Sequence, residues 1–528
     1  MEQRKIYKIC GNWIKIRDEF VNKYFLSVEA GRQMTVYISH DNDINKEIHL
    51  KIKDRKCSVK CVDLSNLKKT PFEFNIKHKG IKSLLKLLKQ FGYQKGTVGE
   101  VATLSYYLGQ QLVFDVLLNS FLGNIMFVYN NIDERKFLKL FTKLVDEKQL
   151  EIMDRDKITK TTKKLSLKTT EIIDNYGILD SHLNKFCLST GFCSSEDTVS
   201  LKEEVDTFDN DYSEYEKLYY EEFGTELLGK TSINKTYLYK PVSIVIPCFN
   251  SEATIIQTIA SIQSQNVPKN LLRKTEVILV DDGSNIPIEN VLKKYGGKIY
   301  TQVKIVRLNR NSGPSTARNI GADVAKQKII LFIDSDILLP SNYLMEISIR
   351  NIFIPTAVFV TFKQNIEKDN EKISLKNIQK GLAVPNPSLD MRITKKIDQN
   401  VPGVYAINRE KYIEILSETD CFKQFGYGRK VGIFDLPAMV VSHNVSTRRK
   451  NFFRAGGFSN EFIGWGMEDS FFGARMIARR NFIIPILSTG VYHIDHLPRS
   501  GSEEEKEKEF KINLAKYKKL MMDTLDED

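Results

Sequence analysis

Short apolar runs alternate with amphipathic stretches along the second half of the chain. The runs VSIVIPC, EVILV and IILFI are nearly uninterrupted, and residues that favour turns bound each of them. Strands with this pattern are buried on both faces, as in a parallel sheet connected by helices. Intervening stretches such as SEATIIQTIASIQSQ have the spacing of amphipathic helices. The pattern predicts an α/β domain with a mostly parallel sheet over residues 237–500.

The first 150 residues show a different pattern. Apolar and polar positions alternate in short segments over residues 1–75, including NWIKIRD, which predicts strands. Helical spacing follows over residues 79–150, as in ERKFLKLFTKLVDEKQLEIM, which ends like a strand. The most apolar window, residues 112–129, contains polar residues and predicts a buried helix and no membrane span. We therefore expect residues 1–150 to form an α+β region that is β-rich and then winged-helix-like.

Two further segments, both rich in charged residues, lie between and after these two regions. Residues 151–236 contain the stretch 195–222, which is dominated by Asp and Glu and predicts a helical, acidic linker with a domain boundary. Residues 501–528 predict a charged C-terminal helix.

Bulk composition narrows the class of protein. A chain of 528 residues is longer than a domain with a single hydrophobic core, so we expect two or three domains. Its 42% hydrophobic residues suffice for their cores. The net charge of +12 suits phosphate-bearing ligands or an anionic membrane surface, but abundant acidic residues equally fit a solvated surface. No nucleic-acid motif is present, so we expect no nucleic-acid partner. Seven Cys without regular spacing and an N-terminus without an apolar core favour the cytoplasm.

Carboxylates follow the predicted parallel strands. Asp281 and Asp282 end one strand, and Asp334 and Asp336 end another. Ligands of open α/β sheets bind at these carboxyl ends, although single Asp residues there commonly make turns. Two carboxylates two residues apart after an apolar strand need neutralisation, which a divalent cation provides. The first strand is followed by neither a GxxxxGK[ST] nor a GxGxxG motif, which argues against a P-loop NTPase or a dinucleotide dehydrogenase.

Four segments between residues 240 and 500 form an ordered set of motifs: VSIVIPCFNSEATIIQTIASIQSQ, EVILVDDGS, NSGPSTARNIGADVAKQKIILFIDSD and FRAGGFSNEFIGWGMEDSFFGARM. Through these segments, residues 240–500 resemble family 2 glycosyltransferases with the GT-A fold, in the order found in chondroitin-polymerase-like and galactosyl- or N-acetylgalactosaminyltransferase-like members. The resemblance implies a metal-dependent, inverting transferase that moves a hexose or N-acetylhexosamine from a UDP-sugar to an acceptor hydroxyl.

The resemblance also implies a donor site. Its nucleotide-binding residues would be Pro247, Phe249, Glu252, Asp281, Asp282, Gly313, Arg318, Asn319 and Asp334. Asp281 and Asp282 match the acids at the uracil and ribose, and which one contacts the base stays open. Mn²⁺ or Mg²⁺ would bind Asp334 and Asp336, with His493 or His496 as a third ligand; we favour His493.

The stretch GWGMED would form the acceptor side. The resemblance implies that Asp469 is the general base, that Glu468 holds sugar hydroxyls and that Trp465 offers a face for a sugar ring. A simpler interpretation makes both acids first-turn residues stabilised by a helix N-terminus, with Trp465 in the core.

The acceptor itself depends on the N-terminal half. Residues 1–150 resemble PqqD-type modules, which capture a peptide by strand addition, so the acceptor would be a peptide or, alternatively, a saccharide. Peripheral membrane contact and the oligomeric state stay open. Two other functions compete: a nucleotidyltransferase that makes the sugar nucleotide, and a non-catalytic UDP-sugar-binding protein.

Overall fold

The computed structural model divides into an N-terminal unit, residues 1–196, and a C-terminal unit, residues 197–528, each described here by itself. The structure describes residues 5–24, 26–40, 42–53, 56–63, 72–76, 84–85, 87–88, 90–118, 125–129, 134–153, 172–173, 200–208, 210–229, 238–295, 299, 301–386, 390, 430–431, 434–495 and 502–523.

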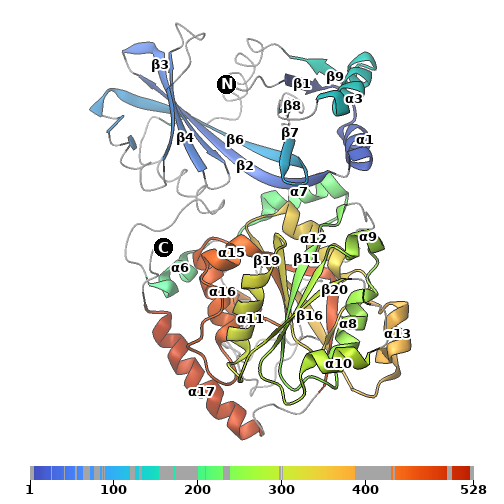
Figure 1. Ribbon diagram of the computed structural model, residues 1–528. Coiled ribbons are helices and arrows are strands. Elements are labelled where there is room, and N and C mark those ends of the chain that lie inside the picture. Colours follow the sequence, from blue (N-terminus) through green and yellow to red (C-terminus); the bar gives the residue numbers. More distant parts are fainter. Residues whose placement is uncertain are drawn as a thin grey trace. The chain divides into compact units, whose positions relative to one another are not determined.

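An antiparallel sheet dominates the N-terminal unit (Figure 1). Its strands are β1 Lys5–Ile9, β2 Ser27–His40, β3 Asp43–Lys53, β4 Lys56–Asp63, β5 Phe72–Ile76, β6 Tyr93–Leu108, β7 Gln111–Leu118, β8 Ile125–Val128, β9 Leu150–Ile152 and β10 Ile172–Ile173. They follow the order β5-β4-β3-β2-β6-β7-β8-β1-β9, and β10 pairs with β6. The helices α1 Trp13–Tyr24 and α3 Glu134–Asp146 belong to this unit.

Alternation along the first strands is confirmed. Met34, Val36 and Ile38 of β2 are buried in one cluster with alternate residues of β3 and β4. The side-chain period of two in a strand places these residues on one face of the sheet. The alternating segments MTVYISH, EIHLKIKD and SVKCVDL therefore lie mainly in strands, as predicted.

Other expectations for this half are wrong. NWIKIRD lies mostly in α1. The window 112–129 was expected as a buried helix, but its described residues lie mainly in β7 and β8. A winged-helix-like end is also excluded for the described residues, because β6 and β7 form a long hairpin. A continuous apolar run does not distinguish a buried strand from a buried helix by periodicity. The helix of residues 134–146 and the strand after it are as predicted.

A mixed sheet forms the centre of the C-terminal unit (Figure 1). Its strands are β11 Val242–Cys248, β12 Glu276–Asp281, β13 Gln302–Arg307, β14 Ile329–Ile333, β15 Ile337–Leu338, β16 Ala357–Ile366, β19 Asn444–Arg448 and β20 Phe482–Ile494, in the order β13-β12-β11-β14-β19-β16-β20-β15. The pairs among β11, β12, β13 and β14 are parallel, whereas β19 runs antiparallel to β14 and β16. The predicted α/β sheet is confirmed. The short strands β17 Lys430–Val431 and β18 Phe434–Asp435 pair separately.

Helices cover this sheet. They are α6 Leu201–Thr207, α7 Ser213–Phe223, α8 Ile255–Gln263, α9 Lys269–Leu272, α10 Ile288–Lys294, α11 Pro314–Val324, α12 Tyr343–Phe353, α13 Leu375–Lys380, α15 Arg449–Arg454, α16 Glu468–Ala478 and α17 Glu503–Leu520. Gly321 lets α11 approach β11 and β12, because a Cβ there would lie 2.3 Å from a methyl of Val245. This close approach places the first turn of α11 beside the strand ends.

The acidic segment after residue 195 is not a linker. Its described part is helical, as expected, but α6 and α7 pack into the C-terminal unit. Asn210 donates to the carbonyl of Ile483 and accepts from its N–H, both at 2.9 Å. Glu204 forms a buried ion pair with Arg480 at 2.5 Å. The acidic composition suggested a solvated segment. Some of its acidic side chains, such as Glu204, are instead buried, and Glu204 pairs with Arg480.

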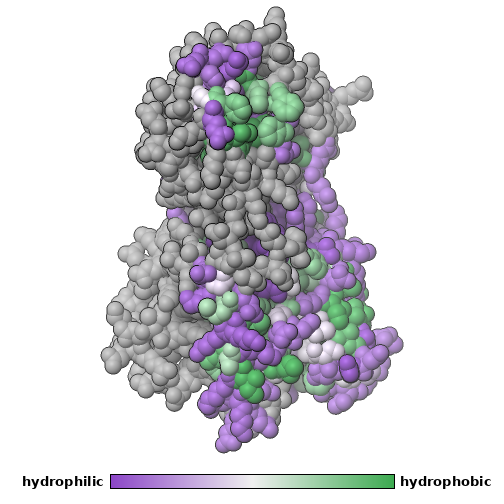
Figure 2. All heavy atoms as spheres, turned by 90° about the vertical axis from the view of Figure 1, so that its left-hand side faces the viewer, coloured by the Kyte–Doolittle hydropathy of each residue, from purple (hydrophilic) through white to green (hydrophobic). Residues whose placement is uncertain are grey.

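Helix α17 is charged and lies along the outside of the C-terminal unit (Figure 1). Asn513 and Tyr517 on one side of this helix are nevertheless buried. On the face of the molecule in Figure 2, hydrophilic side chains separate the hydrophobic patches. Within the described residues, no helix has the length and apolar character needed to cross a membrane.

Two ion pairs with the same spacing test the importance of burial. Glu346 and Arg350 of α12 are fully buried and 2.5 Å apart, and Ser488 also donates to Glu346. Replacing Glu346 with Ala should lower the free energy of unfolding by about 3–5 kcal/mol, because Arg350 would stay buried without its counter-charge. Urea unfolding measures this loss.

The control is Glu289, which pairs with Lys293 at the same spacing on an exposed face of α10. Glu289→Ala should leave the urea midpoint essentially unchanged, since exposed pairs contribute little. Equal losses in the two variants would contradict the importance given to burial.

Candidate active site

Asp281 and Asp282 stand where β12 ends. The carboxylate of Asp281 accepts the N–H groups of Ser284 and Ile288, at 2.9 and 3.1 Å, and pairs with Arg307. Although burial opposes it, these hydrogen bonds lower the pKa of Asp281 below its ordinary value. Asp281 is therefore an anion that shapes the turn after β12.

Asp282 faces a different partner. Its two carboxylate oxygens accept the N–H groups of Ser312 and Gly313, at 2.7 and 2.9 Å. Burial raises the pKa of Asp282, and these two hydrogen bonds only partly oppose the rise. The carboxylate thus holds the loop that leads into α11. With both acids used inside the protein, the choice between them for base contact stays a prediction.

Residues of the predicted nucleotide loop follow β11. Pro247 is buried in the strand, Phe249 is half-buried and Glu252 is exposed. Asn250, which the sequence reasoning missed, has φ +49° and accepts the N–H of Asn285 at 2.9 Å. Its own N–H donates to Ser284 at 3.0 Å. Asn250 thus joins the loops after β11 and β12, as Asn tolerates the left-handed region better than most residues.

Three predicted residues lie at the start of α11. Gly313, at φ +90°, precedes the helix. The side chain of Asn319 donates to the carbonyl of Phe458 at 2.8 Å and accepts its N–H at 2.9 Å, so it anchors the segment before GWGMED. The guanidinium of Arg318 is buried and lies 2.7 Å from Asp334. Asn319 therefore has a structural role, whereas Arg318 forms a buried ion pair with Asp334.

Two of the proposed metal ligands, Asp336 and His493, lie close to each other. Nε2 of His493 lies 3.8 Å from Oδ1 of Asp336, and the rings of His493 and His443 are 6.2 Å apart. Two atoms can share a cation only within about 4.2 Å, twice a typical metal–oxygen distance. Asp334 instead holds Arg318, and no group of three His, Cys, Asp or Glu in the described residues forms a ready-made metal site. His496 lies outside the described residues.

A cation that arrives bound to the substrate does not need all of its ligands from the protein. Mg²⁺ typically binds one or two carboxylates together with the phosphates of a substrate. Carboxylate oxygen also suits Mn²⁺. Asp336 and His493 therefore fit a divalent cation that a diphosphate would share.

Glu468 and Asp469, here called the acid pair, begin α16. Burial, and then the charge of Asp469, raise the pKa of Glu468 to about 8. Burial also raises the pKa of Asp469, but Arg318 and hydrogen bonds from Ser442 oppose this rise. Near neutral pH we therefore expect Glu468 to keep its proton. Both acids also lie in the first turn of α16, where a helix N-terminus stabilises negative charge. This stabilisation and a catalytic role do not exclude each other.

One buried cation connects the donor and acceptor sides. The charges of Asp334, Asp469 and Glu468 raise the pKa of Arg318, although burial opposes them. Arg318 thus lies among acids from β14 and α16, which are distant in the sequence. The assignment of these residues to a donor side and an acceptor side stays a prediction.

Trp465 lies in the Trp loop, defined as residues 462–467. Its side chain packs on α17, with the ammonium of Lys506 4.8 Å above the ring and the ring of Phe510 5.7 Å away. The residue is 37% exposed, so it is not a core residue. Its predicted contact with a sugar ring remains a prediction. The contacts with α17 were missed, because a highly charged helix gave no sign of them.

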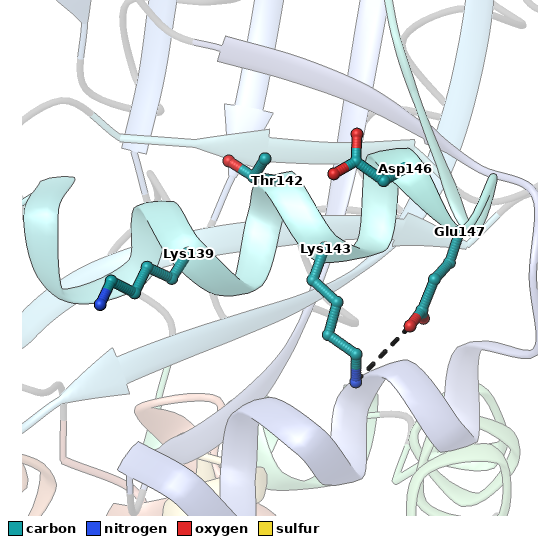
Figure 3. A pocket seen from close by; sticks show the side chains of 5 residues that line it. All are labelled: Lys139, Thr142, Lys143, Asp146 and Glu147. Carbon is teal, nitrogen blue, oxygen red and sulfur yellow. Dashed lines mark ion pairs between the residues drawn. The ribbon is translucent and has the colours of Figure 1, made fainter.

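A pocket in the N-terminal unit is unrelated to these residues. It follows one face of α3 and is lined by Lys139, Thr142, Lys143, Asp146 and Glu147 (Figure 3). Lys143 also pairs with Glu19 of α1 at 3.2 Å. Within this lining Lys143 pairs with Glu147 at 3.8 Å, and none of the five residues belongs to the predicted motifs. The strand ends of the C-terminal unit therefore remain the candidate active site.

Comparison with known families agrees with this location. Residues 243–416 match the model of glycosyl transferase family 2, and residues 438–497 match the model of the N-terminal domain of galactosyltransferase. The chain carries a family 2 glycosyltransferase domain. The first match contains both Asp motifs, and the second contains the acid pair and His493.

Several glycosyltransferases are similar to this domain. A poly(ribitol-phosphate) beta-glucosyltransferase of Bacillus spizizenii is 38% identical over 104 residues, which are 20% of this chain and 16% of the relative. Chondroitin synthase of Escherichia coli is 25% identical over 268 residues, 49% of this chain and 35% of the relative. The chain thus spans well under two thirds of these relatives.

Solved glycosyltransferase structures also match. TarS 1-349 of S. aureus in complex with UDP-GlcNAc has 16% identity and a TM-score of 0.33, covering 53% of this chain and 70% of that one. GalNAc-T7 with UDP, GalNAc and Mn²⁺ has 17% identity and a TM-score of 0.37, covering 56% and 51%.

The raised pKa of Glu468 makes stability depend on pH. An unfolded chain releases this proton near pH 4.5, whereas the glycosyltransferase domain holds it to about pH 8, so the group destabilises the fold as pH rises between these values. Glu468→Gln should therefore raise the melting temperature more at pH 8 than at pH 5. The exposed Glu461→Gln serves as control. If Glu468→Gln changes the melting temperature by the same amount at pH 5 and at pH 8, the raised pKa of Glu468 is refuted.

Proposed function

We propose that the C-terminal unit is a metal-dependent, inverting glycosyltransferase that moves a hexose or N-acetylhexosamine from a UDP-sugar to an acceptor hydroxyl. The observation that carries this proposal is the convergence of Arg318, Asp334 and the acid pair at the end of β14. Asp469, whose ionised form is favoured by Arg318 and Ser442, and Glu468, whose raised pKa favours the protonated form, stand beside residues suited to a nucleotide diphosphate. The match of residues 243–416 to family 2 glycosyl transferases supports the same chemistry.

The donor would occupy the ends of β11, β12 and β14. Asp336 and His493 would hold a divalent cation, which stabilises the negative charge on the leaving diphosphate. Arg318 keeps Asp334 oriented through a 2.7 Å contact. The loops that would surround the nucleoside are tied together through Asn250 and Asp282, so the donor site would be largely formed before the substrate binds.

Asp469 would act as the general base. Burial raises the pKa of Asp469, and Arg318 and Ser442 oppose this rise. In its ionised form Asp469 would accept the proton of the acceptor hydroxyl as that oxygen attacks the anomeric carbon. The bond from the anomeric carbon to the diphosphate breaks, and UDP leaves with the electron pair. One displacement from the opposite face inverts the anomeric centre. Glu468, which retains a proton, would donate a hydrogen bond to a substrate hydroxyl.

For the acceptor we favour a saccharide or another polyhydroxyl chain over a peptide. Relatives are named for transfer to poly(ribitol-phosphate) and for chondroitin synthesis. The order of strands and helices that suggested a peptide-binding module does not match the observed N-terminal unit, in which β6 and β7 are strands. A binding role for the N-terminal unit remains part of the proposal.

The motif carboxylates give the direct test. Asp469→Asn should reduce UDP-sugar turnover by about 10²–10⁴-fold, the usual contribution of a general base. Asp336→Asn should weaken the response to Mn²⁺ in the same assay. Release of UDP from a panel of UDP-hexoses and UDP-N-acetylhexosamines, with and without acceptor oligosaccharides, measures both effects.

Asp323→Asn is the matched control, because Asp323 is exposed on α11, outside the cluster. Full activity in Asp336→Asn and Asp469→Asn would exclude the proposal. UDP-sugar binding by wild type without any turnover would favour a binding protein, and pyrophosphate release from UTP and a sugar phosphate would favour a nucleotidyltransferase.

The two acids should produce a bell-shaped pH profile of kcat/KM. Activity should fall on the acid side above the ordinary range of Asp, since the pKa of Asp469 is raised by burial. It should fall again near pH 8, where Glu468 loses the proton that it donates. Glu468→Gln keeps a neutral donor, so this variant should lose the alkaline fall. An alkaline fall that persists in Glu468→Gln would assign it to another group.

A further inference from the structure

Helix α17 binds the backbone of the Trp loop. The carboxylate of Glu509 accepts the N–H of Trp465 at 2.9 Å. The amide of Asn513 donates to the carbonyls of Ile463 and Trp465, at 3.0 and 3.1 Å, and its side chain is fully buried. Three hydrogen bonds thus reach backbone groups within three consecutive residues, which fixes the path of the loop.

The glycines of the Trp loop are shaped to this helix. Gly464 and Gly466 have φ of +77° and +98°. A Cβ on Gly464 would lie 2.5 Å from the carboxyl carbon of Glu509, and one on Gly466 would lie 2.9 Å from the ring of Phe510. In this arrangement the glycines allow both the backbone conformation and the close approach of α17. They belong to a fixed contact between the Trp loop and α17.

The same helix also supports the element that follows the loop. Met467 is buried at φ +75° and is the residue before the acid pair. Such a conformation costs a residue other than Gly about 1–3 kcal/mol and persists only where the surroundings enforce it. On the other side of the acid pair, Phe471 of α16 packs on Tyr517 of α17, with ring centroids 6.3 Å apart. Helix α17 thus contacts the chain before and after the two acids.

We propose that α17 is the positioning element of the acceptor side and that Glu509 and Asn513 are positioning residues for the acid pair. This inference rests on the proposed function, because it assigns α17 to the placement of the base. Asn513 is buried, and the carboxylate of Glu509 bonds the backbone of the loop; both act through the Trp loop. Misplacing a reacting group by about 1 Å costs about 10²-fold in rate, so a loop fixed at three backbone atoms contributes directly to turnover.

The test compares two glutamates of α17. Glu509→Ala and Asn513→Ala should lower kcat for UDP-sugar turnover by about 10- to 100-fold, with the donor KM within two-fold of wild type. Glu507→Ala is the control, since Glu507 pairs with Lys511 at 2.8 Å on the exposed side of the same helix. Glu509→Gln keeps an oxygen that accepts the N–H of Trp465, so it should restore most of the lost rate.

Fluorescence gives a readout that does not depend on activity. The chain has two Trp residues, Trp13 and Trp465. In a Trp13→Phe background, Glu509→Ala should shift the emission of Trp465 to longer wavelength, whereas Glu507→Ala should not. A kcat within two-fold of the Glu507→Ala control, or a donor KM that rises as much as kcat falls, would overturn the inference. An inactive wild type would overturn the proposed function instead, and the emission shift would still report the loop contact.

Discussion

The arrangement of charge around Arg318 is the constraint on which the candidate site depends. A buried guanidinium needs compensating anions, and Asp334 provides one directly while the acid pair adds its field. The same cation favours the ionised form of Asp469, against the effect of burial. One residue of α11 therefore connects the end of β14 with the start of α16.

The parallel core was predictable from the sequence because its strands carry an unambiguous pattern. β11, β12 and β14 are buried along their whole length, and each is followed by the polar residues that the motifs contain. Their order in the sheet then brings Asp281, Asp334 and Asp336 to one edge, as expected for parallel strands. Local pattern and global fold agree here, which is why the reasoning from short segments succeeded.

The N-terminal unit shows where such reasoning fails. The segment 112–129 is apolar without a clear period, and only its pairing with β6 and β1 decides that it is extended. Asp115, one of the polar residues in this segment, is buried and accepts the hydroxyls of Ser105 and Tyr129. The roles of Asn210, Glu204 and Asn513 were equally invisible, because their partners lie far along the chain.

The backbone of α6 meets the end of α17. The N–H groups of Leu201 and Lys202 donate to the carbonyls of Asp523 and Met521, at 2.9 and 2.7 Å. The first and last described elements of the C-terminal unit are thus hydrogen-bonded to each other, and both also contact α16. A unit whose two ends meet can be joined to other domains at a single place without stretching its own fold. Such a junction would lie next to α16, the helix that carries the acid pair.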